Sequence, residues 1–125
     1  MATVLIVDDS RTSRKILKEV LEKGNFEVVG EAGNGEEGYL KYKELKPDLV
    51  TMDITMPSMD GIECLSLIKH EDANAKVVMI TAAGQKEKMI EALKRGAEEF
   101  ITKPFDETEV LATLKKVTTK EQPKD

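Results

Sequence analysis

Short, largely apolar runs that end abruptly at polar residues constrain the fold of this chain more than any other feature. Nearly continuous apolar runs are typical of parallel strands that are covered on both faces. Because the carboxyl ends of parallel strands meet at one edge of a sheet, we expect the polar residues after these runs to lie together. The runs and their following residues are 3–7 with Asp8 and Asp9, 49–52 with Asp53, 77–80 with Thr81, and 100–102 with Lys103.

A further run, residues 26–30, mixes polar and apolar residues, which favours an edge strand. Amphipathic segments alternate with the runs, and their ends carry the residues that commonly start and stop helices. Strict alternation of strands and helices predicts an α/β domain with a parallel sheet and helices on both faces. The expected helices cover about 11–23, Asn34 to just before Pro47, Asp60 through Ile68, about 85–95, and Asp106 through Val117.

Apolar stripes on these segments predict which helical side chains pack on the sheet. Aromatic residues make up only 4% of the chain, so aliphatic side chains must fill most of the core. The stripes consist of Ile16, Leu17, Val20 and Leu21; Tyr39, Tyr42 and Leu45; Ile62, Leu65 and Ile68; Met89, Ile90 and Leu93; and Val110, Leu111, Leu114 and Val117.

The length of 125 residues predicts one domain, which we place at 1–118, followed by a polar tail at 119–125. The net charge of -5 and the lack of a basic stripe argue against nucleic-acid binding. A single cysteine, Cys64, excludes an intrachain disulfide and a multi-cysteine zinc site. No apolar stretch approaches the roughly 20 residues of a membrane span, so we expect a soluble, cytoplasmic protein.

The three acids Asp8, Asp9 and Asp53 predict an oxygen-rich pocket at the carboxyl edge of the sheet. Either Asp8 or Asp9 alone could simply cap the helix that follows. Together with Asp53 they form the hard donor set that suits Mg²⁺, and no histidine or cysteine is placed to favour zinc. We therefore predict a magnesium site.

Asp53 could be an ordinary loop acid, but an aspartate projecting from a strand end can attack phosphorus and form an acyl phosphate. Lys103 could be a surface lysine, or its ammonium could hold a carboxylate and later a phosphoryl oxygen. Thr81 could be merely a β-branched strand residue, or its hydroxyl could donate to a phosphoryl oxygen. His70 has no visible partner for catalysis, and no glycine-rich phosphate loop follows a strand.

Four stretches resemble the receiver domain of two-component response regulators, and the similarity extends over essentially the whole chain. The resemblance implies a flavodoxin-like, doubly wound, five-stranded parallel sheet of order 2-1-3-4-5 with five helices; the strand order comes from the resemblance and not from the residue pattern. The stretches are LIVDDS at 5–10, KPDLVTMDITMPSMDG at 46–61, VVMITAAG at 77–84 and GAEEFITKPF at 96–105.

The resemblance also implies a role for each site residue. Asp53 matches the phosphoacceptor, and Asp9 and Asp53 would bind Mg²⁺ directly. Asp8 would reach the ion mostly through water, and the backbone carbonyl of Thr55 would add a ligand. The remaining matches are Thr81 as the switch hydroxyl, Lys103 as the lysine of the site, and Phe100 as the aromatic switch residue.

By the same resemblance, the chain is expected to be a stand-alone, monomeric regulator that takes a phosphoryl group from a histidine kinase, in chemotaxis-type signalling. Its target would bind a face built from the fourth helix, fifth strand and fifth helix, including Lys86, Met89 and Phe100. It would catalyse only its own phosphorylation and autodephosphorylation. A phosphorelay intermediate, a phosphate sink and a receiver cut from a longer regulator remain alternatives.

An aspartyl-phosphate phosphatase is less favoured, because Thr55 stands where that class would need a second acid. Three positions depart from the common receiver pattern. Thr55 replaces a frequent Asn, Ala83 replaces a polar or acidic residue, and Phe100 replaces a frequent Tyr. The first two flank the path along which a hydrolytic water would approach the phosphoryl group, so they affect the rate of autodephosphorylation.

Overall fold

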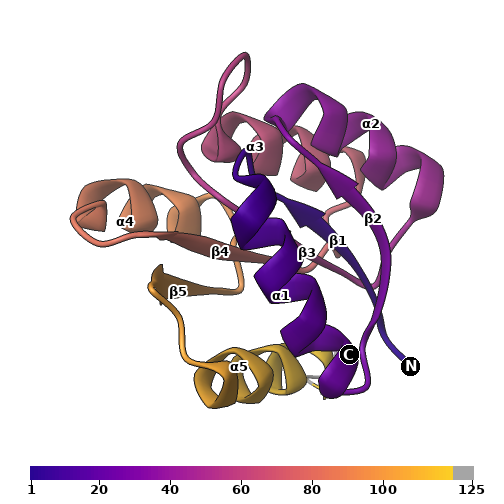
Figure 1. Ribbon diagram of the computed structural model, residues 1–125. Coiled ribbons are helices and arrows are strands. Elements are labelled where there is room, and N and C mark those ends of the chain that lie inside the picture. Colours follow the sequence, from indigo (N-terminus) through magenta and orange to yellow (C-terminus); the bar gives the residue numbers. More distant parts are fainter. Residues whose placement is uncertain (120–125) are drawn as a thin grey trace.

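The computed structural model describes residues 1–119 as alternating strands and helices (Figure 1). The strands and helices follow one another strictly, as the sequence pattern predicts. In chain order they are β1 Thr3–Val7, α1 Arg11–Lys23, β2 Glu27–Ala32, α2 Gly35–Leu45, β3 Leu49–Met52, α3 Gly61–Glu71, β4 Val77–Ala82, α4 Lys86–Lys94, β5 Glu99–Lys103 and α5 Glu107–Thr119.

The five strands form one parallel sheet in the order β2-β1-β3-β4-β5. This arrangement confirms the flavodoxin-like fold, including β2 as an edge strand. The order reverses direction beside β1, because the chain passes from β1 outward to β2 and then returns to β3 on the other side. Open α/β sheets bind ligands at such a reversal, beyond the carboxyl ends of the strands.

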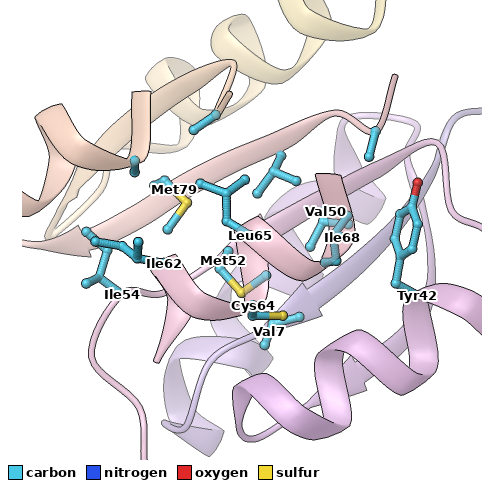
Figure 2. Packing of buried hydrophobic residues seen from close by; sticks show 14 of the residues in the cluster. Val7, Tyr42, Val50, Met52, Ile54, Ile62, Cys64, Leu65, Ile68 and Met79 are labelled. Carbon is cyan, nitrogen blue, oxygen red and sulfur yellow. The ribbon is translucent and has the colours of Figure 1, made fainter. Parts of the chain in front are cut away.

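Helices cover both faces of the sheet, and each face has its own apolar cluster. One cluster joins the sheet to α2, α3 and α4, and Figure 2 shows Met52, Cys64 and Leu65 packed in it. The other cluster joins the sheet to α1 and α5, with Leu21 and Leu114 fully buried. These two apolar layers fix the strands, and hence the residues at the strand ends.

Side chains cap the first turn of four helices, and the sequence signals predict three of these caps, at Asn34, Asp60 and Asp106. Ser10 accepts a hydrogen bond from the Ser13 amide, so α1 is capped by a serine and not by Asp8 or Asp9. Both acids are thereby left for another use. Asn34, Asp60 and Asp106 accept from the amides of Glu37, Glu63 and Glu109 in the same way.

Four residues of the predicted apolar stripes lie on the surface, so these predictions are wrong. On α4 the sheet is met by Met89 and Ala92, which are three residues apart, so the adjacent Ile90 and Leu93 point outward. Leu45 lies beside Gly30 of the edge strand β2. The exposed fractions are 48% for Ile16, 36% for Leu45, 44% for Ile90 and 39% for Leu93.

The predicted tail, 119–125, lies outside the described residues except for Thr119, the last residue of α5. Within residues 1–119, every helix is too short or too polar to cross a membrane.

Candidate functional site

The strand ends bring the predicted acids together at the carboxyl edge of the sheet. Asp8 directly follows β1 and Asp53 directly follows β3, and these two strands are neighbours. The Asp53 amide donates to the Val7 carbonyl at 2.9 Å, which continues the strand pairing beyond β3 and holds the two acids side by side. Backbone pairing therefore fixes this part of the site before any side-chain contact is considered.

Carboxylate oxygens of Asp8, Asp9 and Asp53 lie within 4.8 Å of one another. Asp8 and Asp53 are buried, whereas Asp9 is exposed and opens the cluster to solvent. Three carboxylates at this separation are costly unless a cation compensates them. The donor set consists only of hard oxygen ligands, which fits Mg²⁺ or Ca²⁺ and does not fit a soft metal.

Lys103, the last residue of β5, supplies the positive charge inside the cluster. Its Nζ lies 2.7 Å from Asp8 Oδ2 and 3.5 Å from Asp53 Oδ2. Burial alone would lower the pKa of this ammonium, but the Asp8 hydrogen bond and the charges of both acids outweigh burial and raise it. Lys103 therefore stays protonated and bridges two strand ends that are far apart in the sequence.

The pKa of Asp53 is raised, chiefly because burial penalises its charged form. The charge of Lys103 opposes this rise, whereas the charge of Asp8 adds to it. The Ile54 amide donates to Asp53 Oδ1 at 2.8 Å and also favours the carboxylate. One ammonium thus compensates this edge incompletely, which leaves a place for a further cation.

Thr81 lies near the carboxyl end of β4 and is buried, so the predicted hydroxyl stands on the strand next to Asp53's. Thr55 is exposed in the loop after β3, and its hydroxyl accepts from Gln85 Nε2 at 3.3 Å. Both residues lie at the carboxyl edge that carries the acids.

Phe100 on β5 and Lys86 on α4 are exposed, as a binding face requires. Met89 is only 8% exposed, so its predicted place on that face is wrong. The sheet-facing side of α4 takes Met89 into the core and turns Ile90 and Leu93 outward, so these two replace it on the surface.

Two residues that shape the site were not singled out from the sequence. Gly61 lies so close to β3 that an added Cβ would stand 1.9 Å from the Asp53 carbonyl oxygen. Arg14 on α1 donates to the Asp8 carbonyl at 2.6 Å. The glycine at the start of α3 was a readable signal, because a glycine at that point is a poor helix former; nothing in the local pattern distinguishes Arg14 from a solvated arginine.

Comparison with known proteins agrees with this geometry. Residues 4–115 match the family model described as the response regulator receiver domain. The chain is 53% identical over 114 residues to the chemotaxis protein CheY of Thermotoga maritima, covering 91% of this chain and 95% of that protein. It is 51% identical over 113 residues to the chemotaxis protein CheY of Bacillus subtilis, covering 90% and 94%.

Among solved structures, the fold matches a CheX–CheY complex with BeF3 and magnesium from Borrelia burgdorferi. The TM-score is 0.91 with 44% sequence identity, over 95% of this chain and 90% of that chain. Sequence motifs, strand order and the acidic cluster agree with these matches. The chain belongs to the response regulator receiver domain family and is a receiver of the CheY type.

Proposed function

We propose that the chain is a stand-alone response regulator that accepts a phosphoryl group on Asp53 and thereby changes its affinity for a partner protein. One observation carries this proposal: three carboxylates converge at the sheet edge, and Lys103 contacts two of them. The receiver itself is proposed to cover 1–118. The similarity to chemotaxis proteins over at least 90% of this chain supports a role in motility signalling.

The proposed chemistry is a transfer of one phosphoryl group to the Asp53 carboxylate. A carboxylate oxygen of Asp53 forms a bond to phosphorus while the bond from phosphorus to the donor breaks. When the donor is the phosphohistidine of a kinase, the broken bond is P–N and the leaving imidazole takes up a proton from solvent. When the donor is acetyl phosphate, the broken bond is P–O and acetate leaves.

Magnesium is the cation that the donor set fits. Asp8, Asp9 and Asp53 offer carboxylate oxygens, and the Thr55 backbone carbonyl is the proposed additional ligand. When bound, the ion supplies charge screening between the carboxylate and the incoming phosphoryl group. Lys103 adds a positive charge from the protein itself at the same place.

The proposed switch starts from the charge that phosphorylation adds, about -1.5 to -2 at neutral pH. Lys103 already lies within 3.5 Å of Asp53 and can transfer its contact to a phosphoryl oxygen. Thr81 is proposed to turn toward the phosphoryl group and donate a hydrogen bond from its hydroxyl to another such oxygen. Phe100 is proposed to move from its exposed position into the space that the Thr81 side chain leaves. Two discrete packings would make the response a shift of populations.

The proposed partners are a histidine kinase as donor and a target protein as receiver of the signal. The target would bind the face of α4, β5 and α5, where Lys86, Ile90, Leu93 and Phe100 are exposed. The Borrelia burgdorferi relative was solved with CheX, so a CheY-type receiver does form protein complexes in the presence of BeF3 and magnesium. We propose a monomer that binds no nucleic acid and turns over no external substrate.

Labelling with acetyl phosphate and MgCl2 tests the proposed acceptor. The wild-type chain should gain one phosphoryl group in its intact mass, and hydroxylamine should remove it. Asp53→Asn should lose this labelling, because the amide is a far weaker nucleophile. Asp48→Asn is the matched control, since Asp48 lies at the opposite edge of the sheet and should label normally. Labelling of Asp53→Asn at the wild-type rate would move the acceptor elsewhere.

A further inference from the structure

Arg14 lies just outside the acidic cluster and connects three parts of the structure. It stands on α1, and its side chain is only 19% exposed. One guanidinium nitrogen, Nη1, donates to the Asp8 carbonyl at 2.6 Å, and Nε donates to Glu31 Oε1 at 3.1 Å. A planar guanidinium that makes two directed bonds is held in one orientation, unlike a freely rotating surface arginine.

The Asp8 carbonyl belongs to the peptide group that joins Asp8 to Asp9. A hydrogen bond to this oxygen fixes the plane of the peptide, and that plane sets the direction in which the Asp9 side chain leaves the backbone. Asp8 is also tied on its amino side, because its amide donates to the Ala32 carbonyl at 3.0 Å. The Ala32 carbonyl thus holds the peptide group before Asp8, and Arg14 holds the peptide group between Asp8 and Asp9.

Asp9 depends on this backbone more than the other two acids do. Asp8 is held by Lys103 and by the Ser10 amide, and Asp53 by the Ile54 amide. Within residues 1–119, the Asp9 carboxylate has neither a hydrogen bond nor an ion pair. Its own backbone and side-chain rotamer therefore place it within 4.8 Å of the others, without a hydrogen bond or ion pair from another side chain among the described residues.

Glu31 extends the support to the edge of the sheet. It lies on β2, opposite Ile6 of β1, and its carboxylate accepts from Arg14. Its backbone carbonyl accepts from the Lys41 ammonium of α2. The support for the Asp8–Asp9 peptide therefore runs from α1 through β2 to α2.

We propose that Arg14, oriented by Glu31, is a positioning residue for the metal site: it fixes the Asp8–Asp9 peptide and so sets the affinity for Mg²⁺. This inference rests on the proposed function, which makes the acidic cluster a magnesium site. Outer residues that orient metal ligands commonly change metal affinity by about 10-fold or more when replaced.

The charge of Arg14 alone predicts different Mg²⁺ affinities for the Arg14 variants than positioning does. Arg14 is a cation next to a site for another cation, so its charge alone weakens Mg²⁺ binding. If charge were its only influence, Arg14→Gln would bind Mg²⁺ more tightly, and Arg14→Lys would bind it as the wild type does. Positioning predicts weaker binding in both variants.

Isothermal titration calorimetry with MgCl2 measures this affinity directly on the full chain. We expect the Kd of Arg14→Gln and Arg14→Lys to rise about 10-fold. The matched control is Arg95→Gln. Arg95 also donates hydrogen bonds to an acid and to a second side chain, but these are Glu91 of α4 and Ser66 of α3, away from the Asp8–Asp9 peptide. Its Kd should equal that of the wild type. An unchanged Kd in Arg14→Lys, or a lower Kd in Arg14→Gln, would overturn the proposal.

A second variant covers the case in which replacing Arg14 impairs folding. Glu31→Gln keeps the arginine and weakens only its orienting contact, so a smaller rise in Kd is expected; an unchanged value would count against the proposal. The Mg²⁺ concentration for half-maximal labelling by acetyl phosphate should shift in the same ratio as the Kd. If the wild-type chain itself fails to bind Mg²⁺, the proposed function fails; if it binds and Arg14→Lys binds equally well, only the role of Arg14 fails.

Discussion

Aspartates occupy both ends of the parallel sheet, but they are treated very differently there. At the amino edge, Asp48 Oδ2 accepts from the amide and hydroxyl of Thr3, and Asp72 accepts from the Tyr42 hydroxyl and the Asn74 amide. Both acids are exposed. They are acids satisfied by neutral donors, and they tie neighbouring segments together.

At the carboxyl edge, two of three acids are buried, and within residues 1–119 their carboxylates form ion pairs with one ammonium, that of Lys103. Helices α1, α2 and α3 begin at this edge, so their amide ends face it and favour negative charge there. Residue type alone therefore does not mark a functional acid. Burial and incomplete compensation distinguish Asp53 from Asp72.

The largest difference between the two edges should appear on adding one methyl group. A Cβ at Gly61 would meet the Asp53 carbonyl oxygen at 1.9 Å, and backbone cannot move away cheaply. We expect Gly61→Ala to lower the free energy of unfolding by about 2–3 kcal/mol, measured by urea denaturation. At the other edge, a Cβ at Gly24 meets only the tip of the Leu111 side chain, which can rotate.

Gly24→Ala is therefore the control and should cost less than about 1 kcal/mol. Equal losses in both variants would show that the close approach of α3 to Asp53 is not the cause.

Replacing an acid by its amide should change stability in opposite directions at the two edges. Asp72→Asn weakens a charge-assisted bond from Tyr42, whose pKa is raised to about 12 by burial and by that contact. We expect its free energy of unfolding to fall by up to about 1 kcal/mol. Asp53→Asn removes a buried charge, so its free energy of unfolding should rise by on the order of 1 kcal/mol at neutral pH without Mg²⁺.

The pH dependence gives the sign of the Asp53 effect. Because burial raises its pKa in the folded state, ionisation of Asp53 costs stability as the pH rises through the interval between its unfolded and folded pKa values. The advantage of Asp53→Asn should grow as the pH rises through that interval and should vanish below the unfolded value of about 3.9. Urea denaturation of both chains across this range measures it, and a constant difference at all pH values would contradict the assignment.

The smallest effect concerns the middle of the sheet, between the two edges. The Thr51 hydroxyl is buried in β3 and, in the part of the chain that the structure describes, has no hydrogen-bond partner. Thr51→Val should raise the free energy of unfolding by about 0.5–1 kcal/mol, because it removes an unpaired polar atom. The same exchange at the amino edge, Thr3→Val, should instead lower it, because Thr3 bonds Asp48. Equal signs in the two denaturation experiments would refute this reasoning.

Much of the fold could be predicted from the sequence, because strands and helices leave local signals. Three signals each indicate a boundary that the structure confirms within a residue or two: the apolar run before Asp8, the cap at Asn34 and the glycine after α1. The gathering of Asp8, Asp53 and Lys103 also followed from their places after strands. Strand order did not follow from the pattern and was supplied by the family resemblance.

The alternation of strands and helices and the chemical character of one sheet edge could be predicted from the sequence, since both depend on neighbours along the chain. Which of two adjacent apolar residues on α4 faces the sheet, Met89 or Ile90, depends on how the packed helix is rotated against it, so the sequence pattern could not predict it. The contacts of Arg14 with the Asp8 carbonyl and with Glu31 likewise appear only in the folded chain. Such contacts join elements that are brought together by packing, and the distance between those elements cannot be predicted from the local sequence.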